Sequence, residues 1–365
     1  MANSINGKTV NKSSVTSTLA FIVFFVLYCG SSSNYNLPIY QQNYETLFGP
    51  SLQDVSEWLY YSFEVIGNSL QISFKYFHFI LTATAILILQ SVVRKWIGEY
   101  ALLFYLLFFI FPVGEAISAF RDGLAMCLLT LAFPYLADFK KRNIIIYATI
   151  IFIASAIHRS FVIYYLFLLV GFFDNIKNTS IKSSIKSIYR IFIIVCVGLA
   201  FMPSLLSSVM NSVAEFVSDT EKLGDQSVGY FEGLGNWGFL LYIGFQLICI
   251  YTLYKMRLLS EDYLTSNDKV NNLTRMVLYC DIFLLFLVIA YKANSNFFRI
   301  FWNLMPINYI SLILLSQNSK SKKKSMLFVV FFIFIWVFGI NWGTAFFEEN
   351  YYPMFNDNWI LKLDF

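Results

Sequence analysis

The chain has 365 residues, of which 58% are hydrophobic and 13% charged, and its formal net charge is +4. The mean hydropathy is +0.62. A soluble domain is roughly half apolar and about a quarter charged, so this composition excludes an ordinary soluble domain. Several apolar runs reach the ~20 residues that cross a bilayer as a helix. We therefore expect an all-α polytopic membrane protein, with residues 1–365 forming one integral membrane domain.

In chain order, the apolar runs predict spans at about 15–32, 74–93, 100–114, 123–137, 190–207, 237–254, 276–291, 300–316 and 326–345. The first run is interpreted as an uncleaved helix rather than a signal peptide, because so many spans follow it. The five cysteines all lie in apolar runs without CxxC spacing, which indicates buried core residues. Asp281 lies inside a predicted span. It is interpreted either as a proton-relay acid or, more commonly for such a residue, as a polar group that contacts a neighbouring helix.

The apolar stretch at 144–173 is interrupted by His158-Arg159-Ser160. One tilted helix over this stretch would place the basic segment 174–190 outside and reverse the charge bias of every later loop. A hairpin that turns near His158 avoids this, with arms of about 14 residues each, which are short for a full crossing. We therefore predict a short hairpin at 144–173 and about eleven membrane crossings in total.

With this topology, most of the 26 Lys and Arg residues face the cytoplasm and few of the 22 Asp and Glu residues do. Such a bias is what the positive-inside rule requires. The N-terminus is then inside and the C-terminus outside. The predicted outer segments are the loops 33–73 and 208–236, which we interpret as substrate-facing elements, and the tail 346–365.

Four basic side chains lie at the predicted outer ends of spans: Arg121, His158, Arg159 and Arg299. Ionisable groups at such places usually have a function. Arginine offers planar, bidentate donors to phosphate oxygens. A positively charged site that faces away from the cytoplasm predicts an anionic substrate that approaches from that side.

Each of these residues also has a structural interpretation. Arg121, which opens a predicted helix, would form a salt bridge with Glu115 or Asp122. His158 would be a hydrogen-bonded core residue, and Arg299 an interfacial anchor among aromatic side chains.

The outer-side residues that are candidates to accept a proton from a substrate are His158, Glu115, Asp122 and Glu232. Because Glu115 and Asp122 flank Arg121, we expect their pKa values to be held low. Glu232 lies on a glycine-rich loop that could close over substrate. His158 is the preferred base, and orientation of a phosphate is its alternative role.

The outer segments are rich in aromatic residues, among them Tyr40, Tyr60 and Tyr230. Most are expected in the interfacial aromatic belt, and some are candidates to stack on sugar rings. Residues 56–66 carry apolar side chains at helical spacing with Glu57 and Glu64 between them, which predicts a helix lying in the outer interface.

Taken together, these motifs resemble the EpsG-type branch of the Wzy family, the bacterial polymerases of O-antigen, capsule and exopolysaccharide repeat units. The resemblance covers nearly the whole chain. The segments that carry the resemblance are Asn43-Tyr44 with Glu57-Trp58-Leu59, Arg121-Asp122-Gly123-Leu124-Ala125, Ala154 to Ser160, Tyr230 and Arg299. The family usually has Gln where this chain has Asp122, which puts a direct role for that position in doubt.

The resemblance implies a GT-C-like membrane glycosyltransferase in the bacterial cytoplasmic (inner) membrane. Its donor and acceptor would be undecaprenyl-diphosphate-linked oligosaccharides, and the growing glycan would be transferred to a new repeat unit at the outer face. His158, Arg121 and Arg299 would be catalytic; Arg159, Ser160, Glu115, Asp122, Tyr230 and Glu232 would bind diphosphate or glycan. No metal or other cofactor and no nucleic acid is expected. A chain-length regulator and a flippase of the same pathway are possible partners.

Three other classes compete with this interpretation. A lipid-linked oligosaccharide flippase also needs cations for an anionic headgroup, but it would predict a charged cavity open to both faces and often an internal repeat. An O-antigen ligase usually carries a His in a large outer loop. The two histidines of this chain are His78 and His158, and neither lies in the long outer loop 208–236. A membrane acyltransferase has no motif in this chain to support it.

Overall fold

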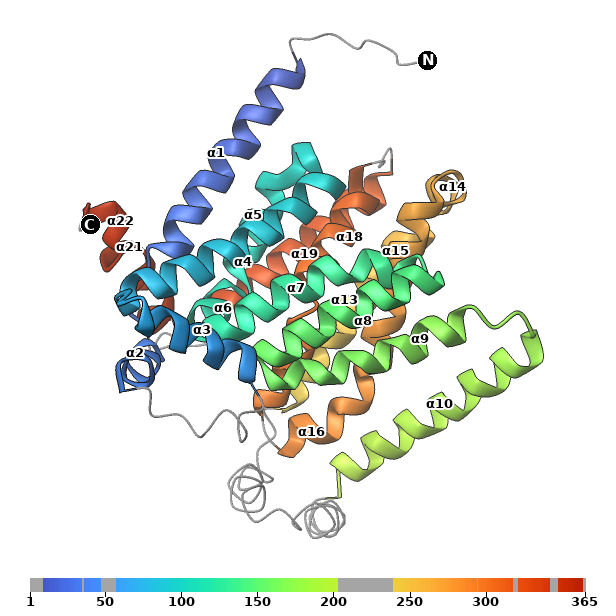
Figure 1. Ribbon diagram of the computed structural model, residues 1–365. Helices are drawn as coiled ribbons and strands as arrows, with labels where there is room; N and C mark the ends of the chain where they lie inside the picture. The colour runs from blue at the N-terminus through green and yellow to red at the C-terminus, as the bar shows by residue number, and fades with distance from the viewer. Residues whose placement is uncertain are drawn as a thin grey trace, which may run out of the picture.

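The computed structural model describes residues 9–34, 36–46, 57–202, 239–293, 295–317, 321–341 and 347–363 (Figure 1). Within these ranges the chain is helical, with one isolated bridge between Ser31 and Asn358. Six helical stretches are long and apolar enough to cross a membrane: Phe74–Trp96 (α4), Phe120–Ala137 (α7), Thr179–Ala200 (α10), Phe239–Leu258 (α13), Asp268–Lys292 and Asn296–Gln317. The protein is therefore an all-α, multi-pass membrane protein, as the composition predicts.

Further α-helices lie outside these six stretches. They are α1 (Thr9–Cys29), α2 (Leu37–Thr46), α3 (Trp58–Ser69), α5 (Ala101–Ile110), α6 (Val113–Ser118), α8 (Lys141–Ile157), α9 (Phe167–Asp174), α14 (Glu261–Ser266), α19 (Lys322–Asn341), α21 (Tyr352–Asn356) and α22 (Trp359–Lys362). α15 (Asp268–Phe283), η3 (Leu284–Leu287) and α16 (Val288–Ala293) form one of the long stretches, and η4 (Ser295–Phe298), α17 (Arg299–Trp302) and α18 (Met305–Gln317) follow them. The helix predicted over residues 56–66 is confirmed as α3, and its position in the outer interface stays a prediction.

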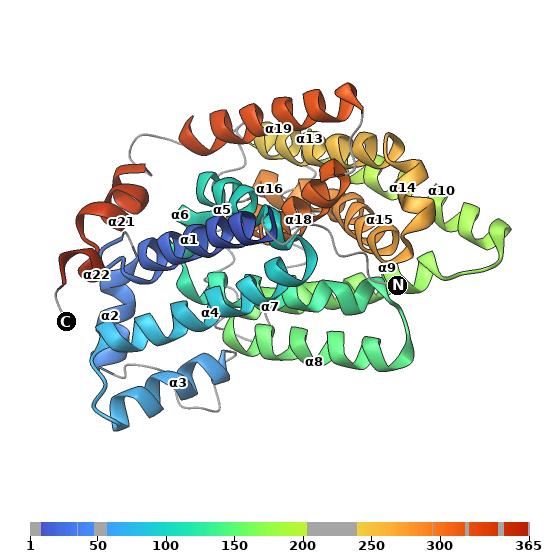
Figure 2. The same cartoon turned by 90° about the horizontal axis from the view of Figure 1, so that it is seen from above.

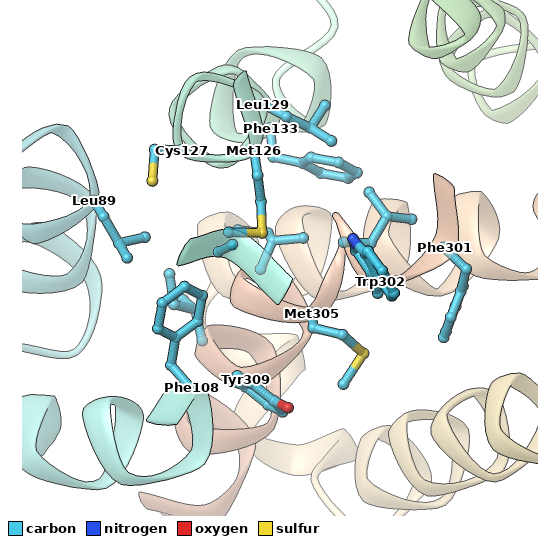
Figure 3. Packing of buried hydrophobic residues seen from close by; sticks show 14 of the residues in the cluster. Leu89, Phe108, Met126, Cys127, Leu129, Phe133, Phe301, Trp302, Met305 and Tyr309 are labelled. Carbon is cyan, nitrogen blue, oxygen red and sulfur yellow. The ribbon is translucent and has the colours of Figure 1, made fainter. Parts of the chain in front are cut away.

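The core lies around α18, which is buried along its length. Figure 2 shows α13 and α19 on one side of it and α3, α4, α7 and α8 on the other. In Figure 3, aliphatic, aromatic and sulfur-containing side chains from α4, α5, α7, α17 and α18 fill the space between the helices. The Tyr309 hydroxyl donates to the Phe111 carbonyl at 2.6 Å, so the one polar group of this buried side chain has a hydrogen-bond partner. All five cysteines are buried and free, as expected.

The chain reverses at His158. α8 ends there because the His158 backbone is extended (φ −141°, ψ 112°), and the 3₁₀ helix η2 (Arg159–Leu166) leads back along α8 into α9. Two hydrogen bonds hold the arms side by side: Tyr147 Oη donates to the Tyr164 carbonyl at 2.8 Å, and Tyr165 Oη to the Ala148 carbonyl at 2.9 Å. The hairpin is therefore confirmed as a fold, whereas eleven crossings stay a prediction.

Segments that the sequence assigns to the outer side meet at one end of the molecule. The Asn36 amide donates to Ser118 Oγ at 2.8 Å, and Tyr351 Oη donates to the Ile110 carbonyl at 2.9 Å. The Trp359 amide donates to the Gly30 carbonyl at 3.0 Å. We call this the site end. In Figure 1 it carries α2, α3, α21 and α22 on the left.

Segments assigned to the cytoplasm also contact one another. Arg275 Nη2 lies 3.1 Å from Asp174 Oδ2, which links α15 to the end of α9. Ser260 Oγ donates to the Leu315 carbonyl at 3.3 Å, which links the α13–α14 junction to the end of α18. We call this the basic end. It includes the α9–α10 turn and α14 on the right of Figure 1.

Candidate functional site

One carboxylate connects three separate parts of the site end. Glu57 directly precedes α3, and its Oε2 lies 2.5 Å from Nη1 of Arg121 in the first turn of α7. Its Oε1 accepts the Arg159 backbone N–H at 3.0 Å and lies 3.7 Å from His158 Nδ1. Glu57 thus fixes the hairpin turn against the start of α7, which brings two of the sequence-predicted motifs together.

Two aromatic rings lie against the Arg121 guanidinium. Its central carbon lies 5.0 Å from the ring centroids of both Tyr40 and Tyr60, distances typical of cation–π contacts. The side chain is 28% exposed, so a ligand can reach it. Its Nε has no hydrogen-bond partner among the described residues. Arg121 is therefore an oriented cation with donor capacity left for an anion.

His158 is held by the residues that follow it. Its Nδ1 lies 3.1 Å from Ser160 Oγ and accepts the Ser160 backbone N–H at 3.4 Å. In the tautomer that accepts this bond, Nε2 carries the proton. If Nδ1 carries the proton instead, it faces Glu57, and Nε2 is then free to accept a proton from a substrate.

The Arg159 side chain is exposed, and the structure gives it no ion pair within the described ranges; its backbone N–H makes the contact with Glu57. The turn therefore supplies one positioned imidazole and one exposed cation. Both lie at the site end, where the sequence placed them.

A second group of polar residues lies deeper, behind α6. Asn303 donates from Nδ2 to Asp122 Oδ1 at 3.1 Å, and both side chains are buried. The Arg299 guanidinium lies 5.6 Å from the Trp302 ring centroid. Arg299 Nε and Asn303 Oδ1 have no hydrogen-bond partner in the part of the chain that the structure describes. Because buried polar groups are normally satisfied, these atoms are candidates to contact a ligand.

Glu115 belongs to this second group but differs from expectation. Burial in α6 raises its pKa to about 7, Asp122 adds to the rise, and Arg299 opposes it. The expectation that its pKa is held low by Arg121 was wrong, because Arg121 pairs with Glu57 and burial outweighs the attraction of Arg299. At neutral pH, Glu115 is consequently poised between its two protonation states.

The structural interpretation of Arg121 also needs correction. Its ion pair is with Glu57, rather than with Glu115 or Asp122. Tyr230 and Glu232, in the loop 208–236, lie outside the described residues. The described part of the chain contains no group of three or more potential metal ligands, and metal-independent chemistry stays a prediction.

The residues that the sequence analysis did not assign to the site are Glu57, Tyr40 and Tyr60. All three were visible as members of the first outer loop. One feature of the sequence points to Glu57. It is a carboxylate directly before an amphipathic helix, on the same predicted side of the membrane as an arginine that opens a span. The two tyrosines could not be told apart from the belt aromatics around them.

Asp281 lies elsewhere, within the membrane-spanning core. Asn308 donates from Nδ2 to its Oδ1 at 3.1 Å, and Gln246 donates to its backbone carbonyl at 3.0 Å. The side chain is fully buried. These contacts confirm the interpretation of Asp281 as a polar residue bonded to a neighbouring helix.

The model of the EpsG family matches residues 17–357, nearly the whole chain. No curated protein matches the chain. No solved structure matches it either. The matched range contains every described residue of both polar groups.

Proposed function

The chain belongs to the EpsG family, and from this premise we propose that it is a polysaccharide polymerase. The substrates are oligosaccharide repeat units linked through a diphosphate to a polyprenyl lipid of the undecaprenyl type. The growing glycan is transferred from its lipid to a sugar hydroxyl of a new lipid-linked unit. The acceptor oxygen bonds to the anomeric carbon, the bond from that carbon to the diphosphate breaks, and the polyprenyl diphosphate leaves as an anion.

The observation that carries this proposal is the arrangement of the arginines at the site end. A diphosphate leaving group gains negative charge in the transition state, and preorganised donors stabilise such charge most effectively. Arg121 is oriented by Glu57 and by two tyrosine rings, so little reorganisation is needed when substrate binds. Arg299, with its unsatisfied Nε, is the proposed second contact to the leaving group.

His158 is the proposed base for the acceptor hydroxyl. Glu57 lies 3.7 Å from its Nδ1. When Nδ1 carries a proton and faces this carboxylate, in place of accepting the Ser160 backbone N–H, Nε2 can accept the proton of the hydroxyl. Arg159, Ser160, Asp122 and Glu115 are proposed to bind diphosphate or glycan, with Tyr230 and Glu232 from the outer loop. Because arginines supply the positive charge, we propose metal-independent transfer, which predicts activity in excess chelator.

The proposed membrane arrangement is the eleven-crossing topology with a GT-C-like plan. The N-terminus lies inside and the C-terminus outside the bacterial cytoplasmic membrane. Among the described residues, predicted outer segments from 33–73 and 346–365 gather at the site end, which supports it. A chain-length regulator and the pathway's flippase are the proposed protein partners.

Reconstitution distinguishes a polymerase from a flippase and from a ligase. Purified protein is placed in proteoliposomes with synthetic lipid-linked repeat units that carry a fluorescent tag. A polymerase lengthens the glycan into a ladder in detergent as well as in vesicles. A flippase moves the tag across the bilayer without lengthening it, and a ligase transfers glycan only when a lipid A core is supplied. Translocation or ligation without elongation would refute the proposal.

A further inference from the structure

An apolar groove lies between α9, α10 and α15, away from the polar groups described above. It has a volume of about 700 Å³, within the ~300–1,000 Å³ range of ligand pockets. Its walls are Val170 and Phe173 of α9, Ile185, Ile188, Phe192 and Ile193 of α10, and Tyr279, Ile282 and Phe283 of α15. Figure 1 shows α10 running back below α9 from their common turn.

The groove is built into the helix packing. Asn178 caps α10 by accepting the backbone N–H groups of Ser180 at 3.0 Å and Ile181 at 3.2 Å, which fixes where the helix begins. Further along, the Tyr189 ring stacks on Phe283 at 5.7 Å, and its hydroxyl donates to the Ile282 carbonyl at 3.0 Å. The groove lies along α10 on both sides of this contact, from Lys182 to Ile193.

The charges at the groove are concentrated on one face of α10. Lys182, Lys186 and Arg190 are spaced four residues apart and all line it. Lys182 lies 3.3 Å from Asp174, which Arg275 also contacts, so that carboxylate is already shared by two cations. Lys186 and Arg190 are exposed and form no ion pair with any residue that the structure describes. The polar part of the groove is therefore positively charged.

The dimensions of the groove match one leaflet of a bilayer. From Lys182 to Ile193, eleven residues of helix span ~16 Å at 1.5 Å per residue. Half of the ~30 Å hydrocarbon core of a membrane is ~15 Å. Lys182 and Lys186 lie in the half nearest the basic end. Arg190 lies about 12 Å along the groove, and its long side chain can extend its head back toward the basic end. Phe192 and Ile193 form the α10 wall beyond it. A phosphate headgroup with acyl chains has the same distribution of charge and length.

We propose that this groove binds an anionic phospholipid from the leaflet at the basic end, with its phosphate at Lys186 and Arg190 and an acyl chain along Phe192 and Ile193. The glycan-carrier lipid is not the favoured occupant. Its diphosphate belongs at the site end, and the arm from Arg159 to Asp174 separates the two places by about 28 Å. The groove is thus a lipid site distinct from the proposed reaction.

Native mass spectrometry of the full-length protein tests this proposal. Wild-type protein is titrated with phosphatidylglycerol, phosphatidylcholine or undecaprenyl phosphate, and the fraction carrying one lipid is measured. Wild type is expected to retain phosphatidylglycerol in preference to the other two. In Lys186→Gln/Arg190→Gln, its affinity should fall roughly 100-fold, because each charge-assisted hydrogen bond lost at the phosphate costs about a factor of ten.

Two further variants make the result specific. Lys141→Gln/Arg142→Gln removes the same charge from exposed positions at the basic end outside the groove, and it should keep the wild-type affinity. Ile193→Trp keeps the charges but fills the apolar wall, and it should weaken phosphatidylglycerol binding. Equal loss in the control, unchanged binding in both groove variants, or preferential retention of phosphatidylcholine or undecaprenyl phosphate would each overturn the proposal.

Discussion

Glu57 and Arg121 form an ion pair across 64 residues of chain, with Oε2 2.5 Å from Nη1. The same carboxylate accepts the backbone N–H of Arg159. One side chain therefore positions the first outer loop, the start of α7 and the hairpin turn relative to one another. Removal of its charge tests whether the site depends on this connection.

Glu57→Gln should lower both stability and polymer synthesis. The pair is partly buried, so its loss should cost about 1–2 kcal/mol, between the values for exposed and buried pairs. Thermal unfolding of the purified protein measures this cost. The control is Glu45→Gln, which removes the same charge from an exposed position of α2. Equal melting temperatures for wild type and Glu57→Gln would show that the ion pair does not hold the site together.

Arg121→Lys should fail to support polymer synthesis although it keeps the charge. Lysine lacks the planar guanidinium that lies against Tyr40 and Tyr60 and offers several donors at once. The measurement is glycan chain length in cells that express equal amounts of each variant. Lys75→Ala, which removes another cation of the predicted outer side, is the control and should give wild-type ladders. Full-length glycan from Arg121→Lys would mean that a point charge is sufficient.

Glu115 should make stability depend on pH. Burial raises its pKa from 4.5 to about 7 in the folded protein, so between these values the folded state holds a proton that the unfolded state has lost. The associated stability is fully present below pH ~4.5 and is lost as the pH rises through ~7, a change of up to about 3 kcal/mol. Glu115→Gln should flatten the fall in melting temperature between pH 5 and 8. Parallel curves for the variant and wild type would contradict the raised pKa.

Cysteine labelling tests the hairpin topology. The five native cysteines are buried, so their background reaction should be low. A membrane-impermeant thiol reagent applied to intact spheroplasts should label Ser160→Cys, whereas Ser183→Cys should react only after permeabilisation. Reaction of Ser183→Cys in intact spheroplasts would place the α9–α10 turn on the outer side and rule out the predicted orientation.

The sequence predicted the features that depend on local pattern or on charge bias. The hairpin could be predicted because one helix through His158 would reverse the charge of every later loop, and the Tyr147 and Tyr165 bonds confirm it. The partner of Arg121 could not be predicted, since Glu115 and Asp122 are nearer in sequence than Glu57. Nor could the raised pKa of Glu115, which depends on how deeply α6 is buried.

The groove beside α10 illustrates the same limit. The spacing of Lys182, Lys186 and Arg190 places them on one helical face. What that face lies against depends on how α9, α10 and α15 pack. The groove therefore depends on tertiary packing, and the sequence pattern of α10 alone does not predict it.

The most direct test of the proposed reaction is the amount of polyprenyl diphosphate released for each glycosidic bond formed. Purified protein in detergent is supplied with synthetic lipid-linked repeat units, and both products are quantified over time. Wild type should release one polyprenyl diphosphate per bond. The rate should fall by about 10²–10³ in Arg121→Ala or Arg299→Ala, and by about 10²–10⁴ in His158→Gln. Glycan growth without this release, or wild-type rates in all three variants, would contradict the account.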